Sequence, residues 1–261
     1  MFTKNKISDK LLAILPLALL LLLWQASFSY QWTPSWLLPS PAQTATTFYE
    51  LLKSGTILDL ISASAVNAIP PFIFALVAAL FFGTLIGLNS LSRKILYPTL
   101  TAIYPIPSLA WLTLVVLIIG FNRPAIWTVI FISCFFKMIY SVIGGVRGVK
   151  QSWILAARNH GLSNTQIIFQ VILPGALPEI TSGMRMGFGS AWRSLIGAEM
   201  LISTFGGLGT FIWMSQWHFN FDKVIIGIAL IALIGFLAEE YIFKNIEKVT
   251  SNQWGLNKNE L

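Results

Sequence analysis

The chain has 261 residues, of which 56% are hydrophobic and only 10% are charged, whereas about 25% charged residues is usual for a soluble domain. Three long stretches contain no Asp, Glu, Lys or Arg: residues 11–49, 60–92 and 95–122. An apolar run of about 18 residues is long enough to cross the roughly 30 Å hydrocarbon layer of a bilayer as a helix. The composition therefore indicates an integral membrane protein and excludes disordered chains, secreted disulfide frameworks and ordinary soluble enzymes.

The net charge of +7 does not indicate a nucleic-acid-binding protein. Such a protein clusters its basic residues on a soluble face, whereas here they lie between hydrophobic segments and bear on membrane orientation. The single cysteine, Cys134, lies inside an apolar run, so an internal disulfide and a thiolate metal cluster are both excluded.

The apolar segments predict an all-α polytopic fold with six transmembrane helices in one domain, residues 1–261. The first segment follows several lysines like the core of a signal peptide, but its length and the lack of a small-x-small cleavage site favour a retained helix. The expected spans are 11–29, 66–90, 98–120, 124–146, 183–202 and 223–243.

The distribution of Lys and Arg predicts that both termini are cytoplasmic, because cytoplasmic loops carry an excess of these residues. Of the 17 Lys and Arg residues, three fall on the external side, Lys53, Arg123 and Lys223, and two lie within spans, Lys137 and Arg193. The other twelve, 17 minus five, fall on the cytoplasmic side: Lys4, Lys6, Lys10, Arg93, Lys94, Arg147, Lys150, Arg158, Arg185, Lys244, Lys248 and Lys258. An even number of crossings is then required, and six satisfies it.

The longest cytoplasmic connection, 147–182, is predicted to form two short helices. The first covers about 150–160 and stops at Gly161, because glycine readily adopts the left-handed conformation of a C-cap. The second begins at Ser163 with Gln166 three positions later, which is the spacing of a capping box, and it is expected to end at Pro174.

Ala156 and Ala157 lie just before the break at Gly161 and would let another surface approach the backbone of the first helix closely. The residues alone leave two interpretations open. The helix pair either docks onto a partner protein or lies as an amphipathic surface element on the lipid headgroups.

The run from Leu155 to Gly161, followed after nine residues by Val171-Ile172-Leu173-Pro174, resembles the EAA motif of binding-protein-dependent ABC importer permeases. That motif reads Glu-Ala-Ala, three residues, Gly, nine residues, then Ile-x-Leu-Pro. Further stretches resemble the nitrate/sulfonate/taurine branch of the family, which also includes bicarbonate and thiamine-precursor permeases: 174–180, 183–185, 191–192, 198–200 and 206–209.

The resemblance implies a multi-pass permease subunit in the inner (plasma) membrane of a bacterium. Two copies, most simply a homodimer, would form the pathway for a small anionic solute that an external binding protein, periplasmic or lipid-anchored, delivers. A thiamine-precursor-like solute is the alternative within the same class. A cytoplasmic ATP-binding subunit would receive the 150–174 helices through Leu155, Ala156, Ala157, Arg158, Gly161, Leu173 and Pro174. Leu155 stands where the family usually has Glu, so docking here must depend on apolar and backbone contacts, or on Arg158 and Lys150.

The sequence predicts no catalytic residues, no cofactor and no metal site of its own. It has no Gly-rich loop ending in Gly-Lys-Ser or Gly-Lys-Thr, so the energy of ATP must come through a partner. His160 and His218 are expected on opposite sides of the membrane. A secondary transporter is the less favoured alternative because no convincing internal repeat is found.

Ionisable residues within the spans are the candidate pathway residues, because a charge inside the bilayer is costly. These candidates are Lys137, Arg193 and Glu199, with Arg185 at the cytoplasmic end of the fifth span. Glu199 is six residues from Arg193, which is 240° around the helix axis, so the two side chains point to different faces. Three possibilities stay open: both cations face a cavity that favours an anion, they pair with acidic residues such as Glu199, or they snorkel to the interface.

Small residues recur every four positions in the fifth span, at Gly183, Gly187 and Ala191. They predict close helix packing rather than contact with solute. The external connection 203–222 is rich in glycine and aromatic residues, and it is expected either to anchor at the headgroup region or to contact the binding protein. Residues 30–65 are predicted to form another external, partly interfacial connection.

Overall fold

The computed structural model describes residues 6–34 and 36–253, and within these ranges the chain is helical with no strand. This confirms the all-α prediction; Lys4 and Lys258 lie outside the described residues. The elements in chain order are α1 Lys6–Ser29, α2 Pro41–Lys53, α3 Thr56–Leu88, α4 Ser90–Ile103, α5 Ser108–Ile119, α6 Arg123–Gly148, α7 Gln151–Asn159, α8 Asn164–Ile167, the π-helical η1 Ile168–Ile172, α9 Leu173–Leu201, α10 Leu208–Trp217, α11 Phe221–Leu237, the π-helical η2 Ala238–Phe243 and α12 Lys244–Gln253.

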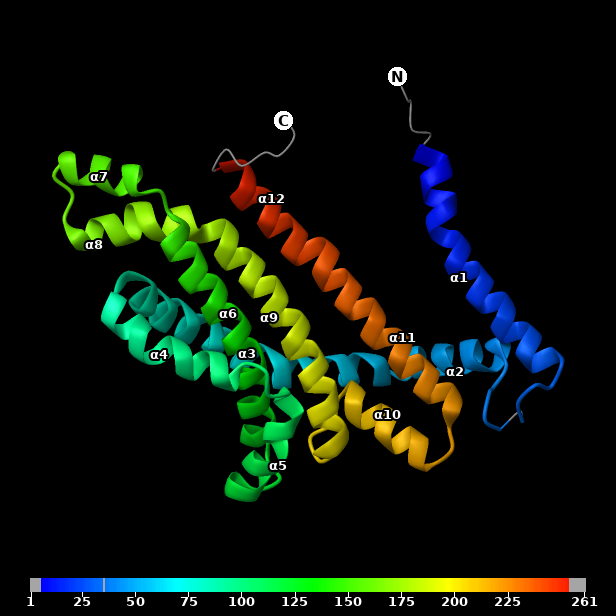
Figure 1. Ribbon diagram of the computed structural model, residues 1–261. Coiled ribbons are helices and arrows are strands. Elements are labelled where there is room, and N and C mark those ends of the chain that lie inside the picture. Colours follow the sequence, from blue (N-terminus) through cyan, green and yellow to red (C-terminus); the bar gives the residue numbers. More distant parts are fainter. Residues whose placement is uncertain (1–5, 35, 254–261) are drawn as a thin grey trace.

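Helix α6 is the centre of the bundle: α9 lies beside it and α3 passes behind it in Figure 1, and both helices pack against it. Its side chains Ile126, Ile130 and Met138 are almost completely buried. Close approach depends on glycines: a Cβ at Gly83 of α3 would lie 2.7 Å from the Cβ of Val142. A Cβ at Gly187 of α9 would lie 2.7 Å from the Met138 side chain.

The small-residue stripe of α9 is a packing surface, as predicted. Gly183, Gly187 and Ala191 are all buried. A Cβ at Gly183 would lie 2.4 Å from the Cβ of Ser141 on α6. Small side chains at these positions therefore let the backbones of α9 and α6 approach closely while both helices stay regular.

Four helical segments are long and apolar enough to cross a membrane: Thr56–Leu88, Arg123–Gly148, Asn164–Leu201 and Phe221–Lys248. They contain four of the six predicted spans. The described part of α1 contributes a shorter apolar helix, Ala18–Ser29. Whether the chain crosses six times, with both termini inside, stays a prediction.

The region of the predicted span 98–120 is bent in the structure, since α4 and α5 meet there at an angle of 94°. The break falls at 104–107, which contains Pro105 and Pro107. Proline lacks a backbone N–H, and its ring clashes with the carbonyl group four residues earlier, so it disfavours a continuing helix even though Tyr104, just before Pro105, keeps helical backbone angles. Two prolines two residues apart therefore end one helix and start another, and α4 begins at Ser90, eight residues before the predicted start at 98.

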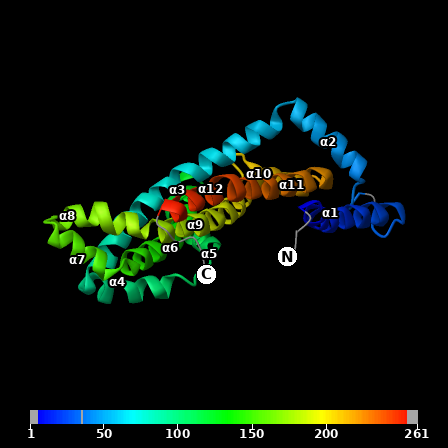
Figure 2. The same ribbon diagram turned by 90° about the horizontal axis from the view of Figure 1, so that it is seen from above.

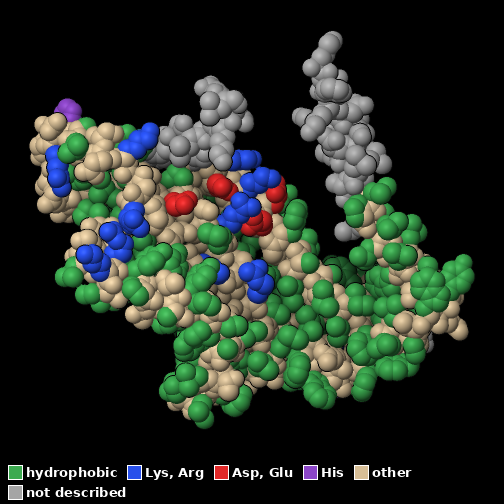
Figure 3. All heavy atoms as spheres, viewed as in Figure 1, with side chains coloured by type: hydrophobic (Ala, Val, Ile, Leu, Met, Phe, Trp, Pro, Cys, Tyr) green, Lys and Arg blue, Asp and Glu red, His purple; other side chains and the backbone are tan. Residues whose placement is uncertain are grey.

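The helix ends that are predicted to be cytoplasmic face the same side of the molecule, although α1 stands far from α7 and α8 (Figure 1). Helices α7 and α8, the start of α1 and the end of α12 lie at one side of the molecule, whereas α5 and α10 lie at the other (Figure 1). On the face seen in Figure 3, Lys and Arg side chains gather over the side that holds α7, and hydrophobic side chains cover the opposite side. Seen from above, α1 stands apart from the bundle of α3, α6 and α9 (Figure 2).

The two predicted helices of the cytoplasmic connection are present as α7 and α8. Gly161 between them has the left-handed φ of 81°, and Ser163 with Gln166 forms the predicted capping box. The predicted helix end at Pro174 is wrong, since α8, η1 and α9 continue as one helical segment from Asn164 to Leu201. The π-helical turn just before Pro174 changes the hydrogen-bond register, so the proline's missing N–H is accommodated without ending the helix.

Replacing Gly83 by Ala is expected to destabilise the bundle. The new methyl group would meet the β-branched Val142 at 2.7 Å, and overpacking of this kind costs about 1–3 kcal/mol. Thermal unfolding of the purified protein in detergent measures the effect. Gly144→Ala on α6 is the matched control: its Cβ would meet nothing within 4 Å, so its melting temperature should be equal or higher. Equal melting temperatures for native protein and the Gly83 variant would contradict the packing argument.

Candidate solute site and coupling segment

A cavity of about 310 Å³ lies beside the bend between α4 and α5. Its wall is formed by the bend itself, by α6 and by α9. The lining includes two cationic residues and four serines: Lys137, Arg193, Ser108, Ser133, Ser190 and Ser194. Among the described residues that line this cavity there is no Asp or Glu.

The two cations of the cavity differ in how they are held. The Lys137 ammonium donates a 2.7 Å hydrogen bond to Tyr104 Oη and lies 4.3 Å from the centroid of the Tyr104 ring, which is within cation–π distance. Arg193 extends back over Gly189, because a Cβ there would lie 3.7 Å from Arg193 Nη1. Within residues 6–34 and 36–253, Arg193 has no ion pair or hydrogen bond, so its charge is not balanced locally.

Four serine hydroxyls form a chain along the cavity wall. Ser108 Oγ lies 2.6 Å from Ser194 Oγ, Ser194 donates to Ser133 Oγ at 2.8 Å, and Ser133 donates to Ser190 Oγ at 3.1 Å. The chain joins the start of α5, the middle of α6 and the second half of α9. Polar groups at this depth are therefore concentrated at the broken helix, where irregular backbone already lines a cavity.

Glu199 lies away from this cavity and is fully buried between α3, α9 and the start of α10. Its carboxyl group accepts hydrogen bonds of 3.0 Å from Ser64 Oγ, Asn67 Nδ2 and the Gly209 backbone N–H. Ser64 Oγ in turn accepts from the Leu208 backbone N–H. Glu199 thus holds the 206–209 turn onto α3, and its described partners include neither Lys137 nor Arg193.

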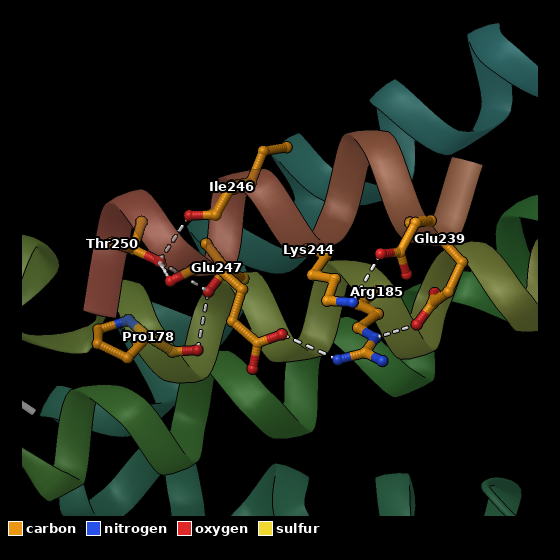
Figure 4. Close-up of polar contacts among 9 residues, drawn as sticks. Pro178, Arg185, Glu239, Lys244, Ile246, Glu247 and Thr250 are labelled. Atoms are coloured by element: carbon orange, nitrogen blue, oxygen red, sulfur yellow. Dashed lines mark hydrogen bonds and ion pairs between the residues drawn. The ribbon is translucent and has the colours of Figure 1, made fainter. Parts of the chain in front are cut away.

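Arg185 also lies outside the cavity. It forms ion pairs with Glu239 of η2 and with Glu247 of α12, the latter at 2.8 Å (Figure 4). Lys244 pairs with Glu240 on the same C-terminal helix. All of these side chains are about half exposed, so the cluster joins the C-terminal helix to α9 at the surface.

The structure therefore brings together two of the four predicted pathway residues, Lys137 and Arg193, and places the other two elsewhere. Sequence reasoning missed the serines. A signal was present, because Ser133 and Lys137, like Ser190 and Ser194, are four residues apart and share a helix face. Only the bend between α4 and α5 brings these two faces to one cavity.

The predicted docking residues divide between the inner and outer faces of the α7–α8 hairpin. Ala157 is buried, and it packs in a cluster with Ile167, Ile172 and α6 side chains. Ala156, Arg158 and Gly161 are exposed, and Leu173 and Pro174 are partly buried. Leu155 is 48% exposed and Phe169 of η1 is 66% exposed, so two large apolar side chains of this segment face outward.

The fold and these two regions define a class of protein: a helical membrane permease with an open polar cavity beside its broken helix and a helical hairpin beyond the end of the bundle. The family described as "Binding-protein-dependent transport system inner membrane component" matches residues 75–242. The chain belongs to this family, whose members are the permease subunits of ATP-binding-cassette importers and act with an ATP-binding subunit and a substrate-binding protein.

Named relatives are similar over most of the chain. The taurine transport system permease protein TauC of Escherichia coli (strain K12) is 33% identical, and the aligned region covers 87% of this chain and 84% of TauC. The nitrate import permease protein NrtB of Synechocystis sp. is 30% identical with the same coverage. Among solved structures, the inward-facing MetNI methionine ABC transporter matches with a TM-score of 0.60 at 16% identity, over 74% of this chain and 95% of that one, which supports the fold alone.

Glu199→Leu is expected to lower stability by about 3 kcal/mol, because it leaves buried donors on Asn67, Ser64 and Gly209 without an acceptor. Glu199→Gln keeps one carbonyl oxygen and should lose less. Thermal unfolding in detergent ranks the three proteins. If the Leu variant has the same melting temperature as the native protein, the Glu199 carboxyl group does not hold the 206–209 turn.

Proposed function

We propose that this chain forms, with a second copy, the translocation pathway for a small oxyanion across the inner membrane of a bacterium. Hydrolysis of ATP takes place on a separate cytoplasmic subunit, and an external protein delivers the solute. The supporting observation is that Lys137 and Arg193 line one cavity that has no acidic residue among its described lining.

Electrostatics favours an anion at this place over any other class of solute. Two positive charges that line one cavity without an acidic neighbour repel a cation and attract an anion. Arginine and lysine are also the donors that bind oxyanions best, arginine through its planar fork and lysine as a point charge. Tyr104 positions the Lys137 ammonium at the cavity by hydrogen bond and ring contact.

The names of the relatives support the same chemistry. They include permeases for taurine, nitrate, aliphatic sulfonates and bicarbonate. Each of these solutes either is a small oxyanion, as nitrate and bicarbonate are, or carries one as a sulfonate group. The cavity of about 310 Å³ has room for a group of this size.

Docking of the ATP-binding subunit is assigned to the outer face of the α7–α8 hairpin. Leu155 and Phe169 present apolar side chains there, and Arg158 is exposed beside them. With leucine at the position where the family usually has glutamate, the partner's cleft must offer apolar surface at this point. The buried cluster around Ala157 keeps the hairpin rigid against the bundle.

Removing either cation is expected to slow anion uptake about tenfold or more, because a charge-assisted hydrogen bond to the solute contributes about 1.5–3 kcal/mol. The assay uses proteoliposomes that contain the chain with its ATP-binding subunit and binding protein, and it measures uptake by Lys137→Ala and Arg193→Ala. Lys53→Ala, which removes an exposed cation on α2, is the control and should transport normally. Unchanged uptake in both cavity variants would reject the pathway role.

Leu155→Asp is expected to weaken binding of the ATP-binding subunit about tenfold or more. A buried apolar contact of this size contributes about 1.5–3 kcal/mol, and a carboxylate in its place would be desolvated without a partner. Co-purification and solute-stimulated ATP hydrolysis measure the loss. Leu155→Met keeps the apolar contact and serves as the control. Because Leu155 is half exposed, the folded state of the Asp variant should be intact, and normal co-purification by it would place docking elsewhere.

A further inference from the structure

We propose that the serine chain of the cavity is directional and presents the hydroxyl of Ser190 as the donor that selects an oxyanion. This inference rests on the proposed function and deepens it. It assigns to an uncharged group the discrimination among anions that the two cations attract alike.

The direction of the chain follows from proton counting, because each serine hydroxyl has one proton to donate. Ser194 gives its proton to Ser133, so at the 2.6 Å contact with Ser108 it must be the acceptor. Ser133 gives its proton to Ser190. All three donations therefore run the same way, from Ser108 to Ser190, and within the described residues the Ser190 proton has no acceptor.

The position of Ser190 places this free donor next to the cations. It precedes Arg193 by three residues on α9, which puts the two on neighbouring parts of one helix face. Both line the cavity together with Lys137 of α6. Hydrogen bonds in a chain polarise one another, so Ser190, which accepts from Ser133, is a stronger donor than an isolated hydroxyl.

The three donors differ in geometry, and together they suit a solute with several oxygens. Arginine offers a planar fork of N–H groups, lysine a point charge, and Ser190 a single directed O–H. An oxyanion such as nitrate or a sulfonate head group can accept from all three at different oxygens. A spherical halide gains the same charge attraction but has no separate oxygens to match these directions, so the site should prefer nitrate to chloride.

Protection of a cysteine at the cavity rim tests this preference without the binding protein. The complex of the chain with its ATP-binding subunit is placed in nanodiscs, in a Cys134→Ala background with Ile106→Cys as the reporter. Cys134 is the single native cysteine, and Ile106 is an exposed residue of the cavity wall. The rate of modification by the neutral reagent N-ethylmaleimide is measured against the concentration of nitrate or chloride, each as the sodium salt.

Nitrate should protect the reporter at a lower concentration than chloride does. Ser190→Ala should raise the nitrate concentration for half-protection about tenfold and bring it close to that for chloride, whereas Ser190→Thr keeps a hydroxyl and should restore the difference. Ser108→Ala should raise the nitrate concentration for half-protection less, because the hydrogen bonds from Ser194 to Ser133 and from Ser133 to Ser190 stay in place. Ser141→Ala, on α6 but outside the cavity, is the matched control and should match the parent.

Two results distinguish a failure of this inference from a failure of the proposed function. If Arg193→Ala abolishes protection while Ser190→Ala matches the parent, the serine chain does not select the solute and the anion pathway stands. If nitrate never protects the parent reporter, both are overturned. If Ser190→Ala aggregates on size-exclusion chromatography, the Ser108→Ala variant provides the test. A reduced nitrate preference in that variant supports the role of the serine chain, and an unchanged preference overturns it. A larger effect of Ser108→Ala than of Ser190→Ala would reverse the direction and contradict the assignment.

Discussion

The close contact of α6 with α3 and α9 is the constraint on which the rest of the structure depends. Gly83 of α3 and Gly187 of α9 meet α6 one helical turn apart, where a Cβ would lie within 3 Å of Val142 and Met138 respectively. In a bilayer, apolar side chains gain little by leaving lipid for protein, so helices associate through tight packing and interhelical hydrogen bonds. The glycines make that packing possible, and they fix the rotation of α6. With this rotation Ile130 and Met138 are buried, while Ser133 and Lys137 reach the cavity.

The cavity exists because one apolar segment is broken. A continuous helix across 98–120 would satisfy its own backbone and leave no wall for polar side chains. The prolines at 105 and 107 separate α4 from α5 and turn them by 94°, so the loop lies against α6 and α9. Irregular backbone within a membrane is tolerated where it faces protein or a cavity, and here Lys137, Arg193 and the serine chain are gathered at this loop.

The elements that follow from local rules could be predicted from the sequence, and those that follow from tertiary contact could not. The capping box at Ser163 and the left-handed Gly161 are set by neighbouring residues. Pro174 was expected to end a helix, but the π-helical turn before it absorbs the missing donor. The cations were recognised by their cost in lipid, yet their separation from Glu199 required the fold, because its partners Ser64 and Asn67 come from α3, more than 130 residues away. A serine in a membrane helix does not carry the cost of a charge, so this cost did not single out the four serines in the sequence. They are recognised only because the fold brings them together at one cavity.

One continuous helical segment connects the hairpin to the cavity. From Asn164 to Leu201 the chain holds the outward-facing Phe169 near one end and Ser190, Arg193 and Ser194 toward the other. At about 1.5 Å per residue, Phe169 and Arg193 are about 36 Å apart along this axis. The hairpin and the cavity wall are therefore joined by helix alone, without a loop between them. Because Ser108 and Lys137 belong to other helices, a shift of α9 would change the serine chain and the spacing of the two cations together. With the ATP-binding subunit docked on the hairpin as proposed, this would couple solute affinity to the state of that subunit.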